Sequence, residues 1–254
     1  MNAYDRFASV YDRIGADRFS RDMVAYTFRI ARRFGVRAQT GLDLCCGTGT
    51  AMELLADRGL SVAGLDRSSA MLSQARRKLM GKGVKLYRQS LPRFRIPDGT
   101  GGGRVRKFDL VTCFYDSLNY LKNERELKAA FRSVYRHLAP GGWFVFDMNT
   151  PVGLKLIWDS QIWGGVRNDV AWIWRNAYHA RTQSAECATT FFVKAGRNWR
   201  RFDELHLERA YSNRVVRRLL RETGLTVIAY YRCFTFDKPS RETCRICAVA
   251  RRNR

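Results

Sequence analysis

The sequence of 254 residues lacks any apolar run that approaches the ~20 residues a membrane-spanning helix needs. Its first residues, MNAYDRFASVYDR, carry charges where a secretory signal peptide needs an apolar segment. Hydrophobic residues still make up 46% of the chain, as is typical of globular proteins. We therefore expect a cytoplasmic protein with no membrane partner, built as one domain with an elaboration.

The cysteines lack the arrangement of a zinc site. Cys244 and Cys247 form a single CxxC pair within the strand-like segment TCRICAVA, and no second pair completes a ligand set. Residues three apart on a strand point to opposite faces. Cys45, Cys46 and Cys113 fall in apolar runs typical of buried strands. The sequence predicts reduced, buried thiols and no metal site.

Acidic residues are scarce relative to basic ones: 23 against 46, which gives a net charge of +23. Such an excess makes nucleic acid a partner to consider. The basic residues are scattered, however, with only short clusters at 31–33, 75–78 and 217–221. Nucleic-acid binding therefore stays an open but less favoured prediction.

Strand-like and helix-like segments alternate along most of the chain. Strands are expected at 42–46, 61–66, 84–89, 108–114, 142–149, 225–236 and 242–250. Helices are expected at 3–14, 19–35, 50–59, 68–83, 123–138 and 212–224. This alternation predicts an α/β, Rossmann-like fold with a doubly wound, mostly parallel seven-stranded sheet.

The pattern changes at about 166–211, where aromatic and β-branched residues alternate with turn signals. We expect roughly three antiparallel strands there. The predicted organisation is a Rossmann-like domain at 1–150 and 212–254, whose residues 1–40 form a helical cap. The segment 151–211 is then an antiparallel insertion that covers the substrate.

The segment GLDLCCGTGT (41–50) joins a buried strand to a helix through a glycine turn. A phosphate-binding P-loop is excluded, because no Lys-Ser/Thr pair follows Gly49. A dinucleotide fingerprint is disfavoured, because Met52 stands where close packing needs Gly or Ala. Asp66 ends the next strand and is placed to accept both ribose hydroxyls. An adenosine-like ligand with an anionic end other than pyrophosphate fits, and the carboxylate of S-adenosylmethionine is such an end.

Four segments in order, LDLCCGTGT, VAGLDRSSAML, FDLVTCFYDSLNYL and HLAPGGWFVFDMNT, resemble the class I S-adenosylmethionine-dependent methyltransferases. The resemblance covers nearly the whole chain. It is most similar to a bacterial single-domain group with a β insertion after strand five and DSLNYL and RFDExHxER signatures, and more distantly to amino-sugar N-methyltransferases. Two departures are Cys45 in place of the first motif glycine, and Gln89-Ser90 where the family has an acidic residue near adenine.

The resemblance implies a set of site residues. Those expected to bind S-adenosylmethionine are Tyr4, Tyr11, Asp43, Cys45, Gly47, Thr48, Gly49, Asp66, Arg67, Met71, Gln89, Ser90, Leu91 and Phe114. The expected catalytic residues are His206, Tyr120 and Asn119, and the expected substrate contacts are Tyr115, Trp174, Arg201 and Glu204.

Several of these residues have ordinary structural explanations as well. Asp43 either orients the glycine turn by accepting its N–H groups or is a plain strand-end acid. Tyr4 and Tyr11 lie on a helical apolar stripe that is either core or a lid over the cofactor. Glu204, His206 and Glu208 share one strand face, which is either solvated or a polar wall of the substrate pocket, with His206 as a general base or as a residue that orients the acceptor.

The predicted function is transfer of a methyl group from S-adenosylmethionine to a small molecule, with S-adenosylhomocysteine as product. The alternatives are an RNA or ribosome-associated methyltransferase, motivated by the charge, and a non-catalytic S-adenosylmethionine-binding regulatory protein. The acceptor, the methylated atom and the choice between monomer and homodimer stay open.

Overall fold

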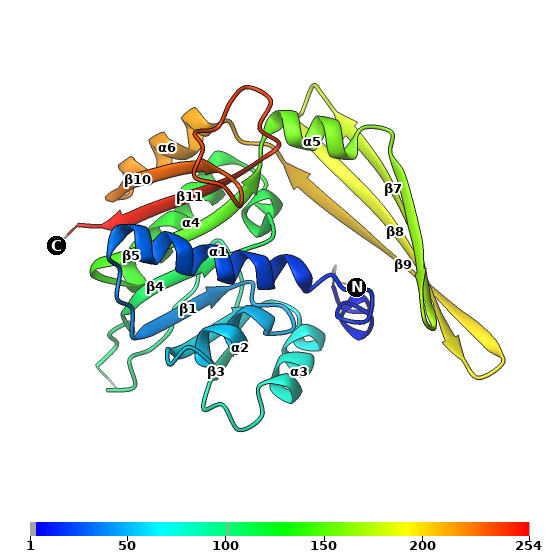
Figure 1. Cartoon of the computed structure of the whole chain (residues 1–254), viewed down its shortest axis with the longest axis horizontal. Helices are drawn as coiled ribbons and strands as arrows, with labels where there is room; N and C mark the ends of the chain where they lie inside the picture. Colours follow the sequence, from blue (N-terminus) through cyan, green and yellow to red (C-terminus); the bar gives the residue numbers. More distant parts are fainter. Residues whose placement is uncertain (1–3, 101, 254) are drawn as a thin grey trace.

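The computed structural model describes residues 4–100 and 102–253 and arranges them around two β-sheets (Figure 1). The larger sheet has seven strands in the order β10-β11-β5-β4-β1-β2-β3. β1 pairs in parallel with β2 and β4, and only β11 runs antiparallel to its neighbours β5 and β10. This confirms the predicted doubly wound, mostly parallel sheet. No helix among the described residues is long and apolar enough to cross a membrane.

The strands of the larger sheet are β1 (Thr40–Leu44), β2 (Ser61–Asp66), β3 (Lys85–Arg88), β4 (Phe108–Cys113), β5 (Leu138–Asn149), β10 (Leu225–Arg232) and β11 (Arg245–Arg252). β5 begins directly after the preceding helix, earlier than the predicted 142–149. Its first residues continue through Pro140 and Gly141, between the predicted helix at 123–138 and the predicted strand at 142–149.

Helices cover both faces of the larger sheet (Figure 1). α1 (Arg18–Phe34), α2 (Thr50–Ala56) and α3 (Ser69–Lys78) pack on one face in a common apolar cluster. α4 (Glu124–His137) and α6 (Asn213–Glu222) pack on the other. Capping residues mark the ends of two of these helices. The Ser68 side chain caps α3 by accepting the Met71 N–H, and α1 ends at Gly35, which has a φ of 64°.

The smaller sheet is antiparallel in the order β6-β7-β8-β9, with β6 (Ile162–Arg167), β7 (Val170–His179), β8 (Ser184–Ala195) and β9 (Asn198–Arg209). The expectation of roughly three strands starting near 166 is corrected to four starting at 162. The helix α5 (Pro151–Trp158) precedes it and was not anticipated. β6 was missed because its sequence, IWGGVR, contains two glycines, which weaken the strand pattern.

The N-terminal segment, residues 4–17, lies between the two sheets rather than forming the predicted helix over 3–14 (Figure 1). It consists of turns around a short 3-10 helix, η1 (Phe7–Ser9); residue 3 lies outside the described residues. The Glu204 carboxylate of β9 accepts the backbone N–H groups of Tyr4, Arg6 and Phe7 at 2.6–2.9 Å. These tertiary bonds hold the segment in its turn conformation.

Met52, the residue that departs from a dinucleotide fingerprint, is accommodated by a glycine on the neighbouring strand. A Cβ added at Gly64 of β2 would lie 2.3 Å from the Met52 Sδ and 3.1 Å from the Cys46 Cβ. Close packing of α2 on β2 needs a small residue on one of the two elements. Here the small residue is Gly64 on the strand, and the large residue is Met52 on the helix. This exchange keeps the glycine turn close to the end of β2.

We predict that Gly64→Ala lowers the free energy of unfolding by about 1–3 kcal/mol, because the core around Met52 is fully packed. In a Met52→Ala background the same change should cost less, since the clashing sulfur is gone. Urea denaturation of the four proteins measures this coupling. Gly41→Ala on β1, whose Cβ would meet nothing nearer than 3.6 Å, is the matched control and should be close to neutral.

Candidate functional site

A cavity of about 310 Å³ opens at the carboxyl ends of β1, β2 and β4. In parallel α/β sheets this edge is where ligands bind. Most of the residues expected to bind the cofactor line it: Tyr4, Tyr11, Asp43, Cys45, Gly47, Thr48, Asp66, Arg67, Met71, Ser90, Leu91 and Phe114. Tyr115 and Tyr120 also line it, together with Asp17, Ser20, Ser117, Lys122 and Glu126, which sequence reasoning did not single out.

Two expected cofactor residues lie away from this cavity lining. Gly49 has φ of 82°, and a Cβ there would sit 2.8 Å from Leu79, so its role is the turn and the packing of α2 on α3. The side chain of Gln89 bonds both the N–H and the C=O of Arg95 and fixes the loop after β3.

Asp66 ties the glycine turn to the start of α3. Its Oδ2 accepts the Gly47 N–H at 2.9 Å and its Oδ1 accepts the Ser68 N–H at 2.8 Å. Burial raises the pKa of Asp66, and these backbone bonds oppose that shift. The structure corrects the idea that Asp43 holds the turn, because the Asp43 Oδ1 instead accepts the Thr112 hydroxyl at 2.7 Å.

Asp43 is a fully buried acid at the floor of the cavity. Burial raises its pKa to about 7, opposed by the Thr112 hydrogen bond. The protonated and ionised forms of Asp43 are therefore close in free energy near neutral pH, whereas an exposed aspartate is fully ionised there. Such a group fits a site where a ligand donates a hydrogen bond or carries positive charge, because either would favour the ionised form.

A second cavity of about 150 Å³ adjoins the first and extends toward the smaller sheet. Tyr4, Tyr11, Tyr115 and Tyr120 line both cavities, so the two spaces meet at a ring of tyrosines. The remaining wall combines aromatic and aliphatic side chains with polar groups: Phe7, Ala16, Ile157, Trp158, Trp163, Trp174, Asn176, Cys187, Thr189, His206, Glu208, Asp116 and Arg245. The lining therefore joins four elements of the smaller sheet to the loop after β4.

The tyrosine hydroxyls and His206 form a chain of polar contacts. Tyr4 and Tyr120 hydroxyl oxygens are 2.7 Å apart, and the Tyr120 hydroxyl is 3.1 Å from the His206 Nδ1. Burial raises the pKa of Tyr4 and Tyr120 well above their usual range, so both hydroxyls stay protonated. Burial lowers the pKa of His206 to about 4, so the imidazole is neutral at neutral pH.

Three other expected residues are placed elsewhere. The Asn119 amide donates to the backbone carbonyls of Asn149 and Arg209 and is buried, so it joins β5 to β9 rather than facing either cavity. Arg201 is exposed and paired with Asp203. Glu204 holds the N-terminal segment through the backbone bonds described above. The structure thus assigns positioning roles to Asn119 and Glu204 and a surface position to Arg201.

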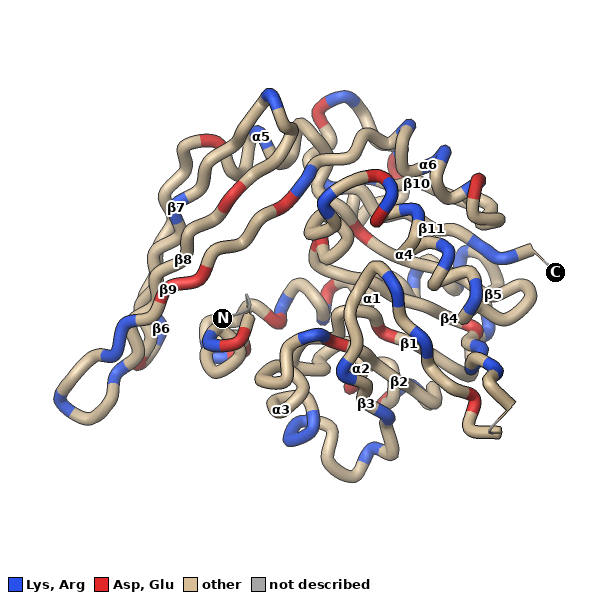
Figure 2. The backbone as a smooth tube through the Cα atoms, turned by 180° about the vertical axis from the view of Figure 1, so that it is seen from behind, with Lys and Arg blue, Asp and Glu red and all other residues tan. Residues whose placement is uncertain are grey.

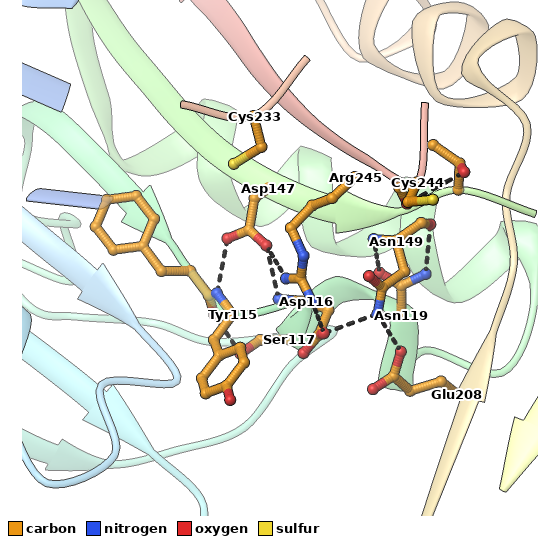
Figure 3. A network of polar contacts seen from close by, with 12 residues as sticks. Tyr115, Asp116, Ser117, Asn119, Asp147, Asn149, Glu208, Cys233, Cys244 and Arg245 are labelled. Atoms are coloured by element: carbon orange, nitrogen blue, oxygen red, sulfur yellow. Dashed lines mark hydrogen bonds and ion pairs between the residues drawn. The ribbon is translucent and has the colours of Figure 1, made fainter. Parts of the chain in front are cut away.

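A buried charged network closes one side of the second cavity (Figure 3). The Arg245 guanidinium of β11 donates to Asp147 and to Asp116, each at 2.5 Å. Asp147 also accepts the backbone N–H groups of Tyr115 and Asp116 at 2.7 and 3.0 Å. The loop after β4, which carries two of the shared tyrosines, is thereby fixed to β5 and β11. Sequence reasoning missed Asp116, Asp147 and Arg245, because their partners are distant in the chain.

The fold, the acidic end of β2 and the glycine turn define an α/β protein that binds an adenosine-containing cofactor at the carboxyl edge of its sheet. Residues 42–142 match the methyltransferase domain family model. A solved S-adenosylmethionine-dependent methyltransferase from Clostridium acetobutylicum is 30% identical, with both chains fully covered and a TM-score of 0.85.

Two further relatives have more specific names. The dTDP-3-amino-3,4,6-trideoxy-alpha-D-glucopyranose N,N-dimethyltransferase of Streptomyces venezuelae is 32% identical over 206 residues, 79% of this chain and 81% of its own. CalS10, an amino pentose methyltransferase of Micromonospora echinaspora solved with S-adenosylmethionine bound, is 25% identical with a TM-score of 0.72, covering 100% of this chain and 99% of its own. The chain belongs to the S-adenosylmethionine-dependent methyltransferases.

We predict that Asp43→Asn stabilises the protein in a pH-dependent way. The native pKa of Asp43 is raised from 3.8 to about 7, so between these pH values the unfolded chain releases a proton that the native state keeps. This costs the wild type stability as pH rises, by at most about 4 kcal/mol. The asparagine keeps the Thr112 bond and has no proton to lose.

The advantage of Asp43→Asn should therefore grow from pH 4 to pH 7 and level off above it. Urea denaturation across that range measures the free energy of unfolding of both proteins. A constant difference at all pH values would contradict the raised pKa.

Proposed function

We propose that this chain transfers the methyl group of S-adenosylmethionine to a small-molecule acceptor bound in the second cavity. One observation carries the proposal: the cofactor cavity and the second cavity adjoin at Tyr4, Tyr11, Tyr115 and Tyr120. A methyl group can pass directly only between neighbouring ligands held in line. The cofactor supplies an activated methyl on a sulfonium, and the protein's task is alignment and exclusion of water.

The cofactor cavity fits this ligand in its donor set. The Asp66 carboxylate lies at the carboxyl end of β2, where it would accept the ribose hydroxyls, and Asp43 also lines the cavity with its pKa raised. Ser90, Leu91 and Met71 line the cavity and are the proposed contacts of the adenine. Tyr4 and Tyr11 of the N-terminal segment would cover the methionine end and exclude water.

The second cavity offers unpaired polar atoms to an acceptor. Within the described part of the chain, the buried Trp174 Nε1 and His206 Nε2 have no hydrogen-bond partner. Buried polar groups of this kind are normally satisfied, so each marks a contact for a polar ligand atom. The tryptophan N–H would donate to an oxygen of the acceptor, and His206, neutral here, would orient it.

We propose an amine as the methylated group. Two of the three named relatives are named for amino sugars: the Streptomyces venezuelae enzyme is an amino-sugar N,N-dimethyltransferase, and CalS10 is an amino pentose methyltransferase. The second cavity supports the same choice, since its acidic groups Asp116 and Glu208 favour a cationic ligand and its aromatic walls attract cations.

An RNA acceptor is the less favoured alternative, motivated by the net charge of +23. Figure 2 shows Lys and Arg residues spread over α1, α3, α6, β11 and the hairpin between β8 and β9, with acidic residues interspersed. An RNA-binding surface would gather such charges along one groove.

We also propose that the protein is cytoplasmic. We propose further that residues 1–150 and 212–254 form the Rossmann-like domain and that the insertion at 151–211 caps the acceptor.

We predict micromolar binding of S-adenosylmethionine and S-adenosylhomocysteine, measured by calorimetry, and no binding of NAD. Asp66→Asn should weaken both by at least about tenfold, because an amide cannot accept from two ribose hydroxyls as a carboxylate does. Asp109→Asn is the matched control. Asp109 also accepts backbone N–H groups, from Gln39 and Thr40, but at the opposite edge of the sheet. Preference for NAD would contradict the cofactor assignment.

The acceptor class is tested with radiolabelled S-adenosylmethionine and a panel of acceptors. The panel holds the dTDP-amino sugar named for the Streptomyces venezuelae relative, its hydroxyl counterpart, cyclohexylamine, cyclohexanol and bulk RNA. We expect methyl transfer to an amine and none to its hydroxyl counterpart. Transfer to RNA that falls steeply with salt would favour the alternative instead.

A further inference from the structure

The second cavity contains a carboxyl group that the assignments above leave without a function. Glu208 of β9 is 3% exposed and lines the cavity beside Asp116 and Arg245. Its Oε2 accepts a hydrogen bond from the Asn149 Nδ2 at 3.0 Å. The same amide nitrogen donates to the Asp116 Oδ2 at 2.7 Å, so Glu208 shares its donor with another carboxylate (Figure 3).

The charges around Glu208 do not balance. Asp116, Asp147 and Glu208 lie together with Arg245, and both hydrogen-bonding arms of the Arg245 guanidinium are used by the two aspartates. No cation within the described part of the chain forms an ion pair with Glu208. Burying an ionised carboxylate without a positive partner costs free energy. Such a group is therefore protonated in the empty site, or it is ionised when a cationic ligand binds beside it.

Burial and the two neighbouring aspartates act on the pKa of Glu208 in the same direction, and two other neighbours oppose them. Burial raises the pKa of Glu208 well above its usual range; Asp116 and Asp147 reinforce the shift, while the Asn149 bond and Arg245 oppose it. His206 on the same strand is neutral near pH 7 and adds no positive charge. The other titratable groups that line this cavity are Tyr4 and Tyr11 from the N-terminal segment, Tyr115 and Tyr120 from the segment after β4, and Cys187 from β8.

We propose that Glu208 is the catalytic base that takes the proton from an ammonium acceptor in the second cavity. This proposal rests on the proposed function. The acceptor's ammonium would supply the positive charge that Glu208 lacks. In a site closed to water, the neutral pair of amine and carboxylic acid is favoured over the ion pair. The desolvation that makes an ionised Glu208 costly is therefore what frees the amine's lone pair.

The step balances in atoms and charge. Glu208, which is protonated in the empty site, loses that proton to solvent as the ammonium enters. One N–H proton then moves from the ammonium to a Glu208 oxygen and leaves a lone pair on nitrogen. That pair forms the new N–C bond while the S–C bond of the sulfonium breaks, and the bonding electrons stay on sulfur. The methylated nitrogen carries the positive charge, and Glu208 holds the proton until product leaves and solvent enters.

Glu208→Gln tests this role, because the amide keeps the shape and an oxygen for Asn149 but cannot take the proton. With the dTDP-amino sugar as acceptor, kcat should fall at least about 100-fold near pH 7, within the range for loss of a general base. Binding of S-adenosylhomocysteine should be unchanged. The remaining rate should rise about tenfold per pH unit toward alkaline pH, since only amine already neutral in solution then reacts.

Recovery at high pH separates a proton-accepting role from a structural one, since a distorted cavity would not be rescued by alkali. Glu186→Gln is the matched control. Glu186 lies on β8 of the same sheet, faces away from the cavity with a side chain 42% exposed, and should turn over like wild type. A Glu208→Gln protein with wild-type kcat and a wild-type pH profile would overturn the proposal.

Infrared spectroscopy reports the protonation state of Glu208 directly, so it tests the proposal even if no amine in the panel is methylated. The wild type minus Glu208→Gln difference spectrum should show a protonated carboxyl band at pH 7, and adding cyclohexylamine should shift the frequency of this band without abolishing it, because the neutral pair of amine and carboxylic acid is favoured. Such a result without turnover would refute the amino-sugar acceptor and leave Glu208 as an ammonium-binding group. In the absence of amine, a protonated carboxyl band that is already lost when the pH is raised above about 5 would overturn the proposal, whatever the turnover, because Glu208 would then have an ordinary carboxyl pKa.

Discussion

The buried pairing of Arg245 with Asp116 and Asp147 is the interaction on which the acceptor side of this protein depends. It joins β11, β5 and the loop after β4, three segments that come together only when the seven-stranded sheet is complete. Asp147 also accepts two backbone N–H groups of that loop, where Tyr115 and Asp116 both have positive φ. A loop strained in this way keeps its shape only if its surroundings fix it.

Once that loop is fixed, its tyrosines have one position between the two cavities. Tyr120 lies against Tyr4 of the N-terminal segment and against His206 of β9. Tyr4 in turn is held by Glu204, also of β9. One strand, β9, therefore holds the N-terminal segment that covers the cofactor cavity and also forms one wall of the acceptor cavity. Changes in β9 should affect both ligands for this reason.

The cofactor half of the site was readable from the sequence because it is local. The glycine turn, Asp66 and the Ser68 cap lie within one strand–turn–helix unit and its neighbour, where spacing determines geometry. The acceptor half was not readable, because Asp116, Asp147, Glu208 and Arg245 are separated by 31 to 129 residues in their pairings. Only the alternation on β9 signalled Glu208, as a face shared with His206.

Where sequence reasoning failed, tertiary contacts had overridden a local pattern. The apolar stripe of Tyr4, Phe7 and Tyr11 has helical spacing, yet the segment is bent because the Glu204 carboxylate takes its backbone N–H groups. Glu204 itself looked like a substrate ligand by its type and its face. The Glu204 side chain is buried and accepts three backbone N–H groups, so it holds a segment of the fold in place rather than binding a ligand.

The two glutamates of β9 on the cavity side illustrate what distinguishes a structural acid from a reactive one. Glu204 accepts three backbone N–H groups, so its charge is compensated within the fold. Glu208, four residues on, has one amide donor that it shares, and its neighbours include two further acids bound to one arginine. Further hydrogen-bond donors or a cation beside Glu208 would stabilise its ionised form. The protein would then be more stable, and Glu208 would no longer bind a proton near neutral pH. The incomplete set of partners keeps Glu208 able to exchange a proton with whatever enters the cavity.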